Sequence, residues 1–155
     1  MHKNRTLNDQ RNTDKSTVTQ DNDAVPLKAP ISDGITYELC AGIVDKNTAL
    51  HSIIQQEVLE ECGYDVPEEK FERVFSSRSS VGVAGSVQSF FYAEVTDSMI
   101  VSEGGGNISE GESIEVYYLP TAKVKQFLFD ESLPKPPSLM AAFFWYQSTK
   151  SQEKL

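Results

Sequence analysis

The stretch that ends at Gly63 constrains the fold of this chain more than any other part of its sequence. Leu50, Ile54 and Val58 recur at every fourth position, so a helix over residues 48–62 would carry one apolar face. Gly63 stands where a glycine ends a helix by adopting a left-handed backbone conformation. The pattern therefore predicts an amphipathic helix that packs its apolar face on a core.

The same helix carries three glutamates, Glu57, Glu60 and Glu61. Spacings of three and four place Glu57 beside the other two on one face. Like charges at these spacings destabilise a helix by about 0.2–0.5 kcal/mol per pair. A hard divalent cation would reverse that sign, because such cations bind oxygen ligands. A solvated acidic face is the ordinary explanation of the bare pattern, so the helix alone does not establish a metal site.

The chain from residue 35 onward alternates between strand and helix patterns, so we expect a mixed α/β fold. Alternating runs rich in β-branched and aromatic residues predict strands, and helical spacing after prolines predicts helices. The strands are expected over residues 35–41, 71–77, 87–96 and 114–119, and the later helices over residues 121–129 and 138–148. A long acidic loop with three consecutive glycines separates the last two strands, and loops of this length are usually functional or mobile.

The composition of the chain changes near residue 34. Residues 1–34 are rich in polar side chains and hold only isolated apolar ones. Such a segment buries too little apolar surface to offset the entropy lost on ordering. We therefore expect a disordered polar tail over residues 1–34, one folded domain over residues 35–150 and a short tail over residues 151–155.

The formal net charge of −9 arises from residues 35–155, because residues 1–34 hold equal numbers of acidic and basic side chains. A nucleic-acid binder needs a basic footprint on its folded part, so this balance argues against a nucleic-acid partner. A small polyanionic ligand would approach such a surface only with metal cations between the two. An acidic surface that only favours solubility is the alternative.

Membrane and secreted classes find little support in the sequence. No apolar run reaches the length needed to span a bilayer, and the first residues lack the apolar stretch of a secretory signal. The two cysteines, Cys40 and Cys62, are too few for a disulfide framework. We expect a reducing, cytoplasmic location and no membrane partner.

The glutamate helix and its flanking glycines resemble the Nudix box, written G-x5-E-x7-R-E-U-x-E-E-x-G-U with U an apolar residue. The residues that fall on its positions without a gap are Gly42, Glu57, Val58, Glu60, Glu61, Gly63 and Tyr64. Two positions depart, because Thr48 replaces the first Glu and Gln56 replaces the Arg. In the family that Arg helps to orient the catalytic carboxylates, so its loss bears on the rate more than on the fold.

Further blocks in the same order resemble the ADP-ribose and nucleotide-sugar pyrophosphatase branch of that family, and its animal UDP-glucose pyrophosphatases most. They cover residues 38–42, 80–95, 105–116, 133–135 and 143–145. The resemblance implies a Nudix fold, in which a mixed β-sheet lies between helices. It also implies the hydrolysis of a nucleoside diphosphate sugar, such as UDP-glucose or ADP-ribose, to a nucleoside monophosphate and a sugar phosphate.

The resemblance implies a metal site for Mg²⁺ or Mn²⁺. Matched position by position, Glu57 and Glu61 would be metal ligands, Glu60 would be a ligand or a supporting group, and the main-chain carbonyl of Ala41 would complete the set. Cations held there would neutralise the phosphates and activate a water molecule.

The acidic loop would supply the remaining catalytic group. Glu112 is the best match to the loop glutamate of the family, as a ligand or general base, with Glu110 as the alternative and Glu60 as a third catalytic candidate. A base among several anions should have a raised pKa, which suits its task. Gly82 and Gly85 match the substrate loop, where glycine lets the backbone approach a ligand, although a plain turn explains them as well.

In the resembled branch a sizeable N-terminal segment precedes the strand that begins at the position of Glu38. It supplies early strands of the sheet and much of the dimer interface. Residues 1–37 show no strand pattern here, so we expect those N-terminal strands to be missing. Two functions remain open: a hydrolase that forms a homodimer, or a catalytically impaired Nudix-like protein that binds a nucleotide sugar or pairs with a full-length relative.

Overall fold

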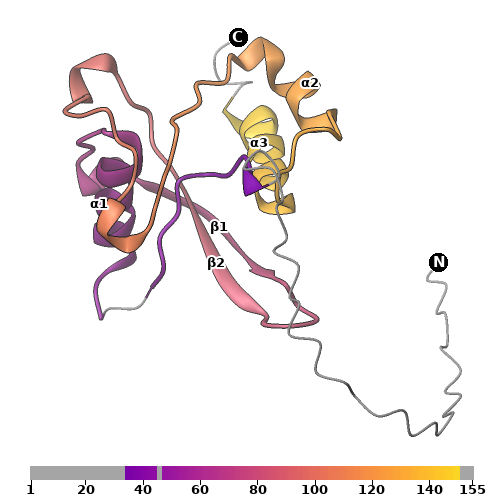
Figure 1. Cartoon of the computed structure of the whole chain (residues 1–155), viewed down its shortest axis with the longest axis horizontal. Helices are drawn as coiled ribbons and strands as arrows, with labels where there is room; N and C mark the ends of the chain where they lie inside the picture. The colour runs from indigo at the N-terminus through magenta and orange to yellow at the C-terminus, as the bar shows by residue number, and fades with distance from the viewer. Residues whose placement is uncertain (1–33, 45–46, 151–155) are drawn as a thin grey trace, which may run out of the picture. The chain divides into compact units, whose positions relative to one another are not determined.

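A computed structural model describes residues 34–44 and 47–150, and its contacts group the chain from Ile35 onward into one unit. Figure 1 shows this unit as three helices and a hairpin of two strands. The predicted tails, residues 1–34 and 151–155, lie outside the described residues apart from Gly34. In the described part of the chain, no helix is long and apolar enough to cross a membrane.

Helix α1 spans Leu50–Cys62 and confirms the helix predicted from the four-residue repeat. Gly63 ends it with φ +77°, and its N–H donates to the carbonyl of Leu59 at 3.1 Å. The N–H of Tyr64 donates to the carbonyl of Val58, which completes the backbone pattern of a glycine-terminated helix. The direction of the chain after α1 is therefore fixed by Gly63.

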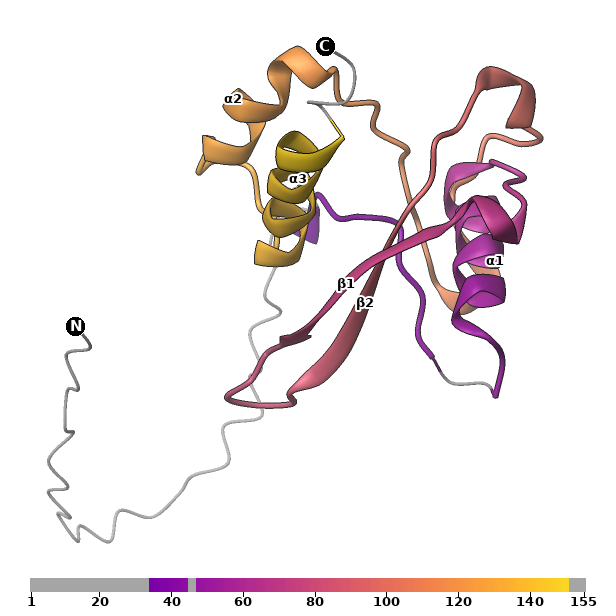
Figure 2. The same cartoon turned by 180° about the vertical axis from the view of Figure 1, so that it is seen from behind.

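Strands β1 (Glu72–Ser79) and β2 (Ser86–Tyr92) form an antiparallel hairpin, the one sheet among the described residues. Its pairing shifts between Arg73 and Phe75, which is the irregularity of a β-bulge. The Phe75 ring stacks on Phe90 across the pair, with 4.3 Å between ring centroids. Figure 2 shows the hairpin crossing from α1 towards α3. These strands confirm the two predicted in the middle of the chain, although β2 ends before residue 96.

Helices α2 (Val124–Phe129) and α3 (Pro137–Thr149) confirm the two helices predicted near the C-terminal end. A 3₁₀ turn, Thr121–Lys123, leads into α2, and three further 3₁₀ turns span Glu68–Lys70, Asp97–Met99 and Ile108–Glu110. The pair of helices contacts the hairpin through Trp145, whose ring lies 5.5 Å from that of Tyr92.

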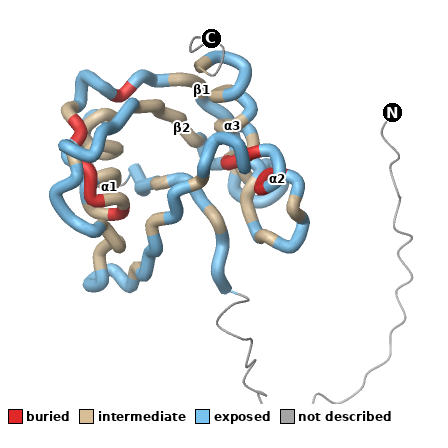
Figure 3. The backbone as a smooth tube through the Cα atoms, turned by 90° about the horizontal axis from the view of Figure 1, so that it is seen from above, coloured by how far each residue is buried: buried red, intermediate tan, exposed pale blue. Residues whose placement is uncertain are grey.

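The buried apolar residues form two separate clusters. Figure 3 marks buried stretches of the backbone in red beside α1 and at α2. The first cluster contains Tyr64, Val66 and Phe71, on which the apolar face of α1 packs. The second contains Val124, Phe127, Leu128 and Leu139, at the junction of α2 and α3. The first cluster holds the end of α1, and with it the glutamates, in place.

The strands predicted over residues 35–41 and 114–119 are wrong, because neither forms a strand in the described structure. A strand needs a backbone partner along its length, whereas these segments give their donors to other elements. The N–H of Tyr37 donates to the carbonyl of Pro134 at 2.8 Å, and that of Ile114 donates to Gly105 at 3.1 Å. The mixed α/β class is confirmed, with helices and a small antiparallel sheet consistent with a Nudix fold.

A pocket of about 510 Å³ opens between the segment that follows Tyr37, α1, the hairpin and α3. Its walls are mostly apolar and include Leu39, Ile53, Phe90 and Trp145. The pocket runs up to Cys40, Ala41 and Gly42, so it reaches the residues that border the glutamate helix.

Candidate functional site

The glutamates of α1 differ in exposure. Glu57 and Glu60 are half-buried, whereas Glu61 is buried with 8% of its surface exposed. A buried carboxylate needs hydrogen-bond donors to offset its lost hydration. The main-chain N–H of Ala41 donates to Oε2 of Glu61 at 3.1 Å. This bond brings the segment before the helix onto the helix face that carries the carboxylates.

Gly42 follows directly and lies against Glu57. A Cβ atom at this position would lie 2.0 Å from Oε1 of Glu57, so the carboxylate occupies the space that a side chain would need. A side chain at the glycine that begins the Nudix-like pattern would therefore displace the carboxylate of Glu57, the first of the clustered glutamates.

The three consecutive glycines of the acidic loop rest on the last turn of α1. The N–H of Gly105 donates to the carbonyl of Glu61 at 3.0 Å, and that of Gly106 donates to the carbonyl of Glu60 at 3.1 Å. Both carbonyls lie at a helix end, where backbone acceptors have no partner inside the helix. Gly104 has φ +70°, and a Cβ atom on it would lie 2.3 Å from the Glu61 carbonyl oxygen. A side chain at Gly104 would therefore hold the loop away from α1.

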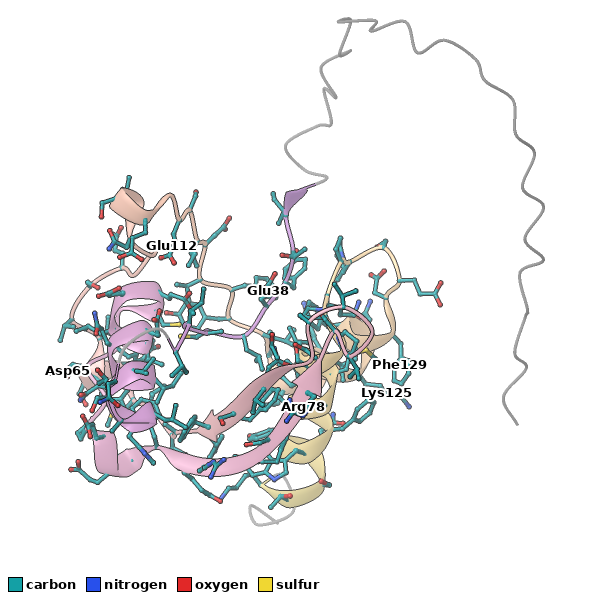
Figure 4. The ribbon with its side chains drawn as sticks, turned by 90° about the horizontal axis from the view of Figure 1, so that it is seen from below. Glu38, Asp65, Arg78, Glu112, Lys125 and Phe129 are labelled. Atoms are coloured by element: carbon teal, nitrogen blue, oxygen red, sulfur yellow. The ribbon has the colours of Figure 1, made fainter. Side chains whose placement is uncertain are left out.

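Asn107 organises the acidic loop beyond the glycines. Its main-chain N–H donates to Oε2 of Glu112 at 2.8 Å, and its side-chain amide donates to Oε1 of Glu110 at 3.0 Å. Its side-chain oxygen accepts the N–H of Ser109 at 3.1 Å and so caps the short 3₁₀ turn. Figure 4 shows Glu112 on the loop at one end of α1.

The negative charges of α1 and of the acidic loop both act on Glu57. Burial raises the pKa of this carboxyl above its ordinary value, and the negative charges of Glu61, Glu60, Glu112 and Glu110 raise it further. The structure therefore brings the five predicted carboxylates, three on α1 and two on the loop, into one electrostatic cluster. Their mutual repulsion means that a cation would stabilise the arrangement.

The chemistry of these donors fits a hard divalent cation, because carboxylate and carbonyl oxygens are its preferred ligands. In the structure, carboxylates of this cluster point towards hydrogen-bond donors. Among the described residues, no group of three or more Asp, Glu, His or Cys side chains is arranged to hold a metal ion. Glu61 accepts from Ala41, and Glu112 accepts from Asn107. Each carboxylate uses one oxygen for this backbone donor, so its other oxygen could bind a cation while the hydrogen bond is kept.

Gln56 stands where the resembled pattern has Arg. Its side-chain amide donates to Oε1 of Glu60 at 2.9 Å, one helical turn away. The contact preserves a donor to the carboxylate cluster but replaces a positive charge by a neutral amide, which is a weaker hydrogen-bond donor to an anion. Glu60 is therefore oriented in this chain without being neutralised.

Gly82 and Gly85 lie in the turn between β1 and β2, where Gly85 has φ +64°. The guanidinium of Arg78 donates to the carbonyl of Gly85 at 2.8 Å. Figure 4 places Arg78 on the hairpin, well away from Glu112. The structure does not bring these two glycines to the carboxylate cluster, and their role as substrate contacts stays a prediction.

Sequence reasoning missed the contact between the two cysteines, which lie far apart along the chain. The Cys62 thiol hydrogen-bonds that of Cys40, and this contact together with burial raises the pKa of Cys40 well above its ordinary value. The same contact lowers the pKa of Cys62. Asn107 was also missed, although an Asn two positions before a Ser is a local signal of a side-chain-capped turn.

The oxygen ligands of the α1 carboxylates and the acidic loop are chemically suited to a hard cation, and several known proteins are similar to this chain in sequence. No family model matches the chain. Uridine diphosphate glucose pyrophosphatase NUDT14 of Bos taurus is 42% identical over 126 residues, which are 81% of this chain and 57% of that protein. The protein of the same name from Mus musculus is 40% identical over 120 residues, 77% of this chain and 54% of its own.

A second group of relatives is named after a different substrate. The GDP-mannose pyrophosphatase of Klebsiella pneumoniae is 37% identical over 98 residues, which are 63% of this chain and 47% of that protein. The chain thus spans about half the length of the relatives that it matches. It is related to the Nudix UDP-sugar pyrophosphatases, which confirms the resemblance seen in the box and in the blocks that follow it.

Proposed function

We propose that this chain hydrolyses the diphosphate bond of a nucleoside diphosphate sugar with the help of Mg²⁺ or Mn²⁺. The observation that carries the proposal is the cluster around Glu57, whose pKa is raised by burial and by the carboxylates beside it. The products would be a nucleoside monophosphate and a sugar phosphate. The names of the relatives support UDP-glucose and GDP-mannose as substrates, and the sequence resemblance adds ADP-ribose.

Glu57 and Glu61 would hold the cation, and Glu60 would be a further ligand or a support. Glu61 turns the Ala41 N–H towards itself, so the carbonyl of Ala41 is the main-chain atom left to serve as a ligand. Bound there, the cation would neutralise the diphosphate and lower the pKa of a water molecule. Without that neutralisation, the −9 chain would repel its own substrate.

Glu112 would act on the attacking water as the general base, with Glu110 as the alternative. Both carboxylates accept hydrogen bonds from Asn107. Backbone hydrogen bonds from the glycines of the same loop dock it on α1.

The test is a hydrolysis screen of the purified chain. UDP-glucose, GDP-mannose and ADP-ribose are incubated with Mg²⁺, with Mn²⁺ or with a chelator, and nucleoside monophosphates are separated by chromatography. Glu57→Gln and Glu61→Gln should each lower turnover by at least about a hundredfold, because each removes a ligand charge. Glu69→Gln is the matched control, since Glu69 is an exposed glutamate in the 3₁₀ turn that follows the α1 region. Unchanged turnover in both ligand variants would refute the proposed site.

A second function is favoured by the contact of Gln56 with Glu60, in which a neutral amide stands where the resembled pattern has a positive charge. In that case the chain would bind a nucleotide sugar without turning it over, or would pair with a full-length relative. Gln56→Arg restores the family residue, so the hydrolase proposal expects it to raise kcat in an already active chain. Absent turnover in both forms, with calorimetric binding of UDP-glucose or co-purification with a full-length relative, would favour the second function.

Assembly and location belong to the same proposal. A homodimer would be measured by sedimentation of the purified chain, with and without substrate. The two free thiols, Cys40 and Cys62, favour a reducing, cytoplasmic location. Fluorescent fusions of the chain would test that location.

A further inference from the structure

The 510 Å³ pocket lies against both of the buried apolar clusters. Ile54 and Phe91, which pack on the first cluster, line the pocket. Val124, a member of the second cluster, lines it as well, together with Leu119 and Phe143, which pack on that cluster. An apolar molecule in the pocket would therefore contact side chains of both groups and join the two clusters into one core.

Aromatic rings from two elements form part of the pocket wall. Phe75 stacks on Phe90 within the hairpin, with 4.3 Å between ring centroids, and Trp145 of α3 lies 5.5 Å from Tyr92 of β2. All four residues line the pocket. Because the rings already contact one another, this wall is in place before a ligand arrives. Preformed, mostly apolar pockets of about 300–1,000 Å³ are the usual sites of small molecules.

The charges around the pocket select against an anion. Among the described residues that line it, none is a lysine or an arginine, whereas Glu38 is an exposed carboxylate of the lining. The chain as a whole carries −9. An anion would lose its hydration in this space without gaining a cationic partner. The neutral side chains of Gln88 and Ser138, which also line the pocket, offer hydrogen bonds to uncharged polar atoms.

We propose that this pocket binds one uncharged, mainly apolar molecule that carries aromatic rings. The ligand would displace water from the apolar walls and fill space between the two clusters. Because it would bind the folded chain and not the unfolded one, it would also stabilise the fold. The proposal does not rest on the proposed hydrolase function, since it uses none of the clustered carboxylates. A chain without turnover would still bind the ligand.

The test uses the full chain and N-phenyl-1-naphthylamine, an uncharged probe whose fluorescence increases in apolar surroundings. We expect saturable binding of one probe per chain, with loss of the emission of Trp145, the one tryptophan of the chain. At a free probe concentration about a hundred times Kd, the melting temperature should rise by about 5–10 °C. The related 8-anilino-1-naphthalenesulfonate has the same rings and an added sulfonate, and it should bind at least about tenfold more weakly.

Two neighbouring alanines of α3 provide matched variants. Ala142 lines the pocket, whereas Ala141 is exposed and is not part of its lining. Ala142→Phe places a ring in the pocket and should weaken binding of the uncharged probe at least about tenfold, while Ala141→Phe should leave it unchanged. Circular dichroism checks that both variants fold, and the comparison of the two probes needs no variant.

Three results would overturn the proposal. The first is binding that does not saturate, or that is as tight for the sulfonate as for the uncharged probe, because loosely packed apolar surface behaves in this way. The second is an equal effect of the two alanine replacements in folded variants. The third is probe binding per chain that falls as the chain concentration rises, which would mean that a second copy of the chain fills the pocket.

Discussion

Replacing Gly104 by Ala should separate the acidic loop from α1. Gly104 has φ +70°, and an added Cβ would lie 2.3 Å from the carbonyl oxygen of Glu61 and 2.8 Å from the carbonyl carbon of Cys62. An L-residue in the left-handed region costs roughly 1–2 kcal/mol. Relief of the clash would break the backbone bonds that Gly105 and its successor donate to α1, each with a net value of about 0.5–1.5 kcal/mol. The expected loss in free energy of unfolding is about 2–5 kcal/mol.

Two glycines of the same chain provide matched controls. Gly111 has φ +84° with open space around it, so Gly111→Ala should show only the backbone cost of roughly 1–2 kcal/mol. Gly82 has open space and no positive φ, so Gly82→Ala should cause no loss of stability. Urea unfolding followed by the fluorescence of Trp145, the one tryptophan of the chain, gives the three values. If Gly104→Ala loses no more stability than Gly111→Ala, the loop does not rest on α1 as described.

Three further predictions test the site and the fold. Gly42→Ala should push the Glu57 carboxylate aside, because the added Cβ would lie 2.0 Å from Oε1 of Glu57. The value of kcat/KM should fall at least about tenfold while the circular dichroism spectrum is unchanged. Full activity of the variant would contradict the close approach. Burial and the neighbouring carboxylates raise the pKa of Glu57, so native stability falls as pH rises through and above the ordinary range of a glutamate. Glu57→Gln should therefore gain stability relative to the native chain as the pH is raised through that range. Urea midpoints measure this gain, and added Mg²⁺ should diminish it. Leu139→Ala should cost about 2–5 kcal/mol because Leu139 is buried at 3% exposure, whereas Phe144→Ala, at 47% exposure, should cost less; equal losses in thermal melts would contradict the described core.

The sequence predicted those elements whose pattern is complete within a few residues. The repeat of Leu50, Ile54 and Val58 defines α1, and Gly63 ends it, without reference to the rest of the chain. The two strands of the hairpin were predicted for the same reason, from runs rich in β-branched and aromatic residues, although their pairing was not. Residues 114–119 show a similar strand pattern, but a strand also needs a partner, and the donors of this segment are used elsewhere.

The same distinction between local and long-range signals applies to the candidate site. Helical spacing alone places Glu57 beside Glu60 and Glu61. The approach of Glu112 was not visible in any spacing, because it depends on the glycines that dock on the last turn of α1, and only the family resemblance suggested it. The hydrogen bond from the Ala41 N–H to Glu61 had no local signal either, because it joins residues twenty positions apart.

In this site, cation binding and turnover depend on different parts of the structure. The carboxylate cluster is assembled from one helix and from two segments that dock on it through backbone hydrogen bonds, so its charges meet without help from the hairpin. The space beside the cluster is different, because the 510 Å³ pocket is walled by the hairpin, α3 and the unpaired segment after Tyr37. Repulsion among carboxylates creates affinity for a divalent cation wherever they are held together, whereas hydrolysis also requires walls that orient a diphosphate in line with water. We therefore expect calorimetry to detect Mg²⁺ binding that Glu57→Gln weakens even in preparations with low turnover. Turnover without measurable cation binding would mean that these carboxylates are not the site.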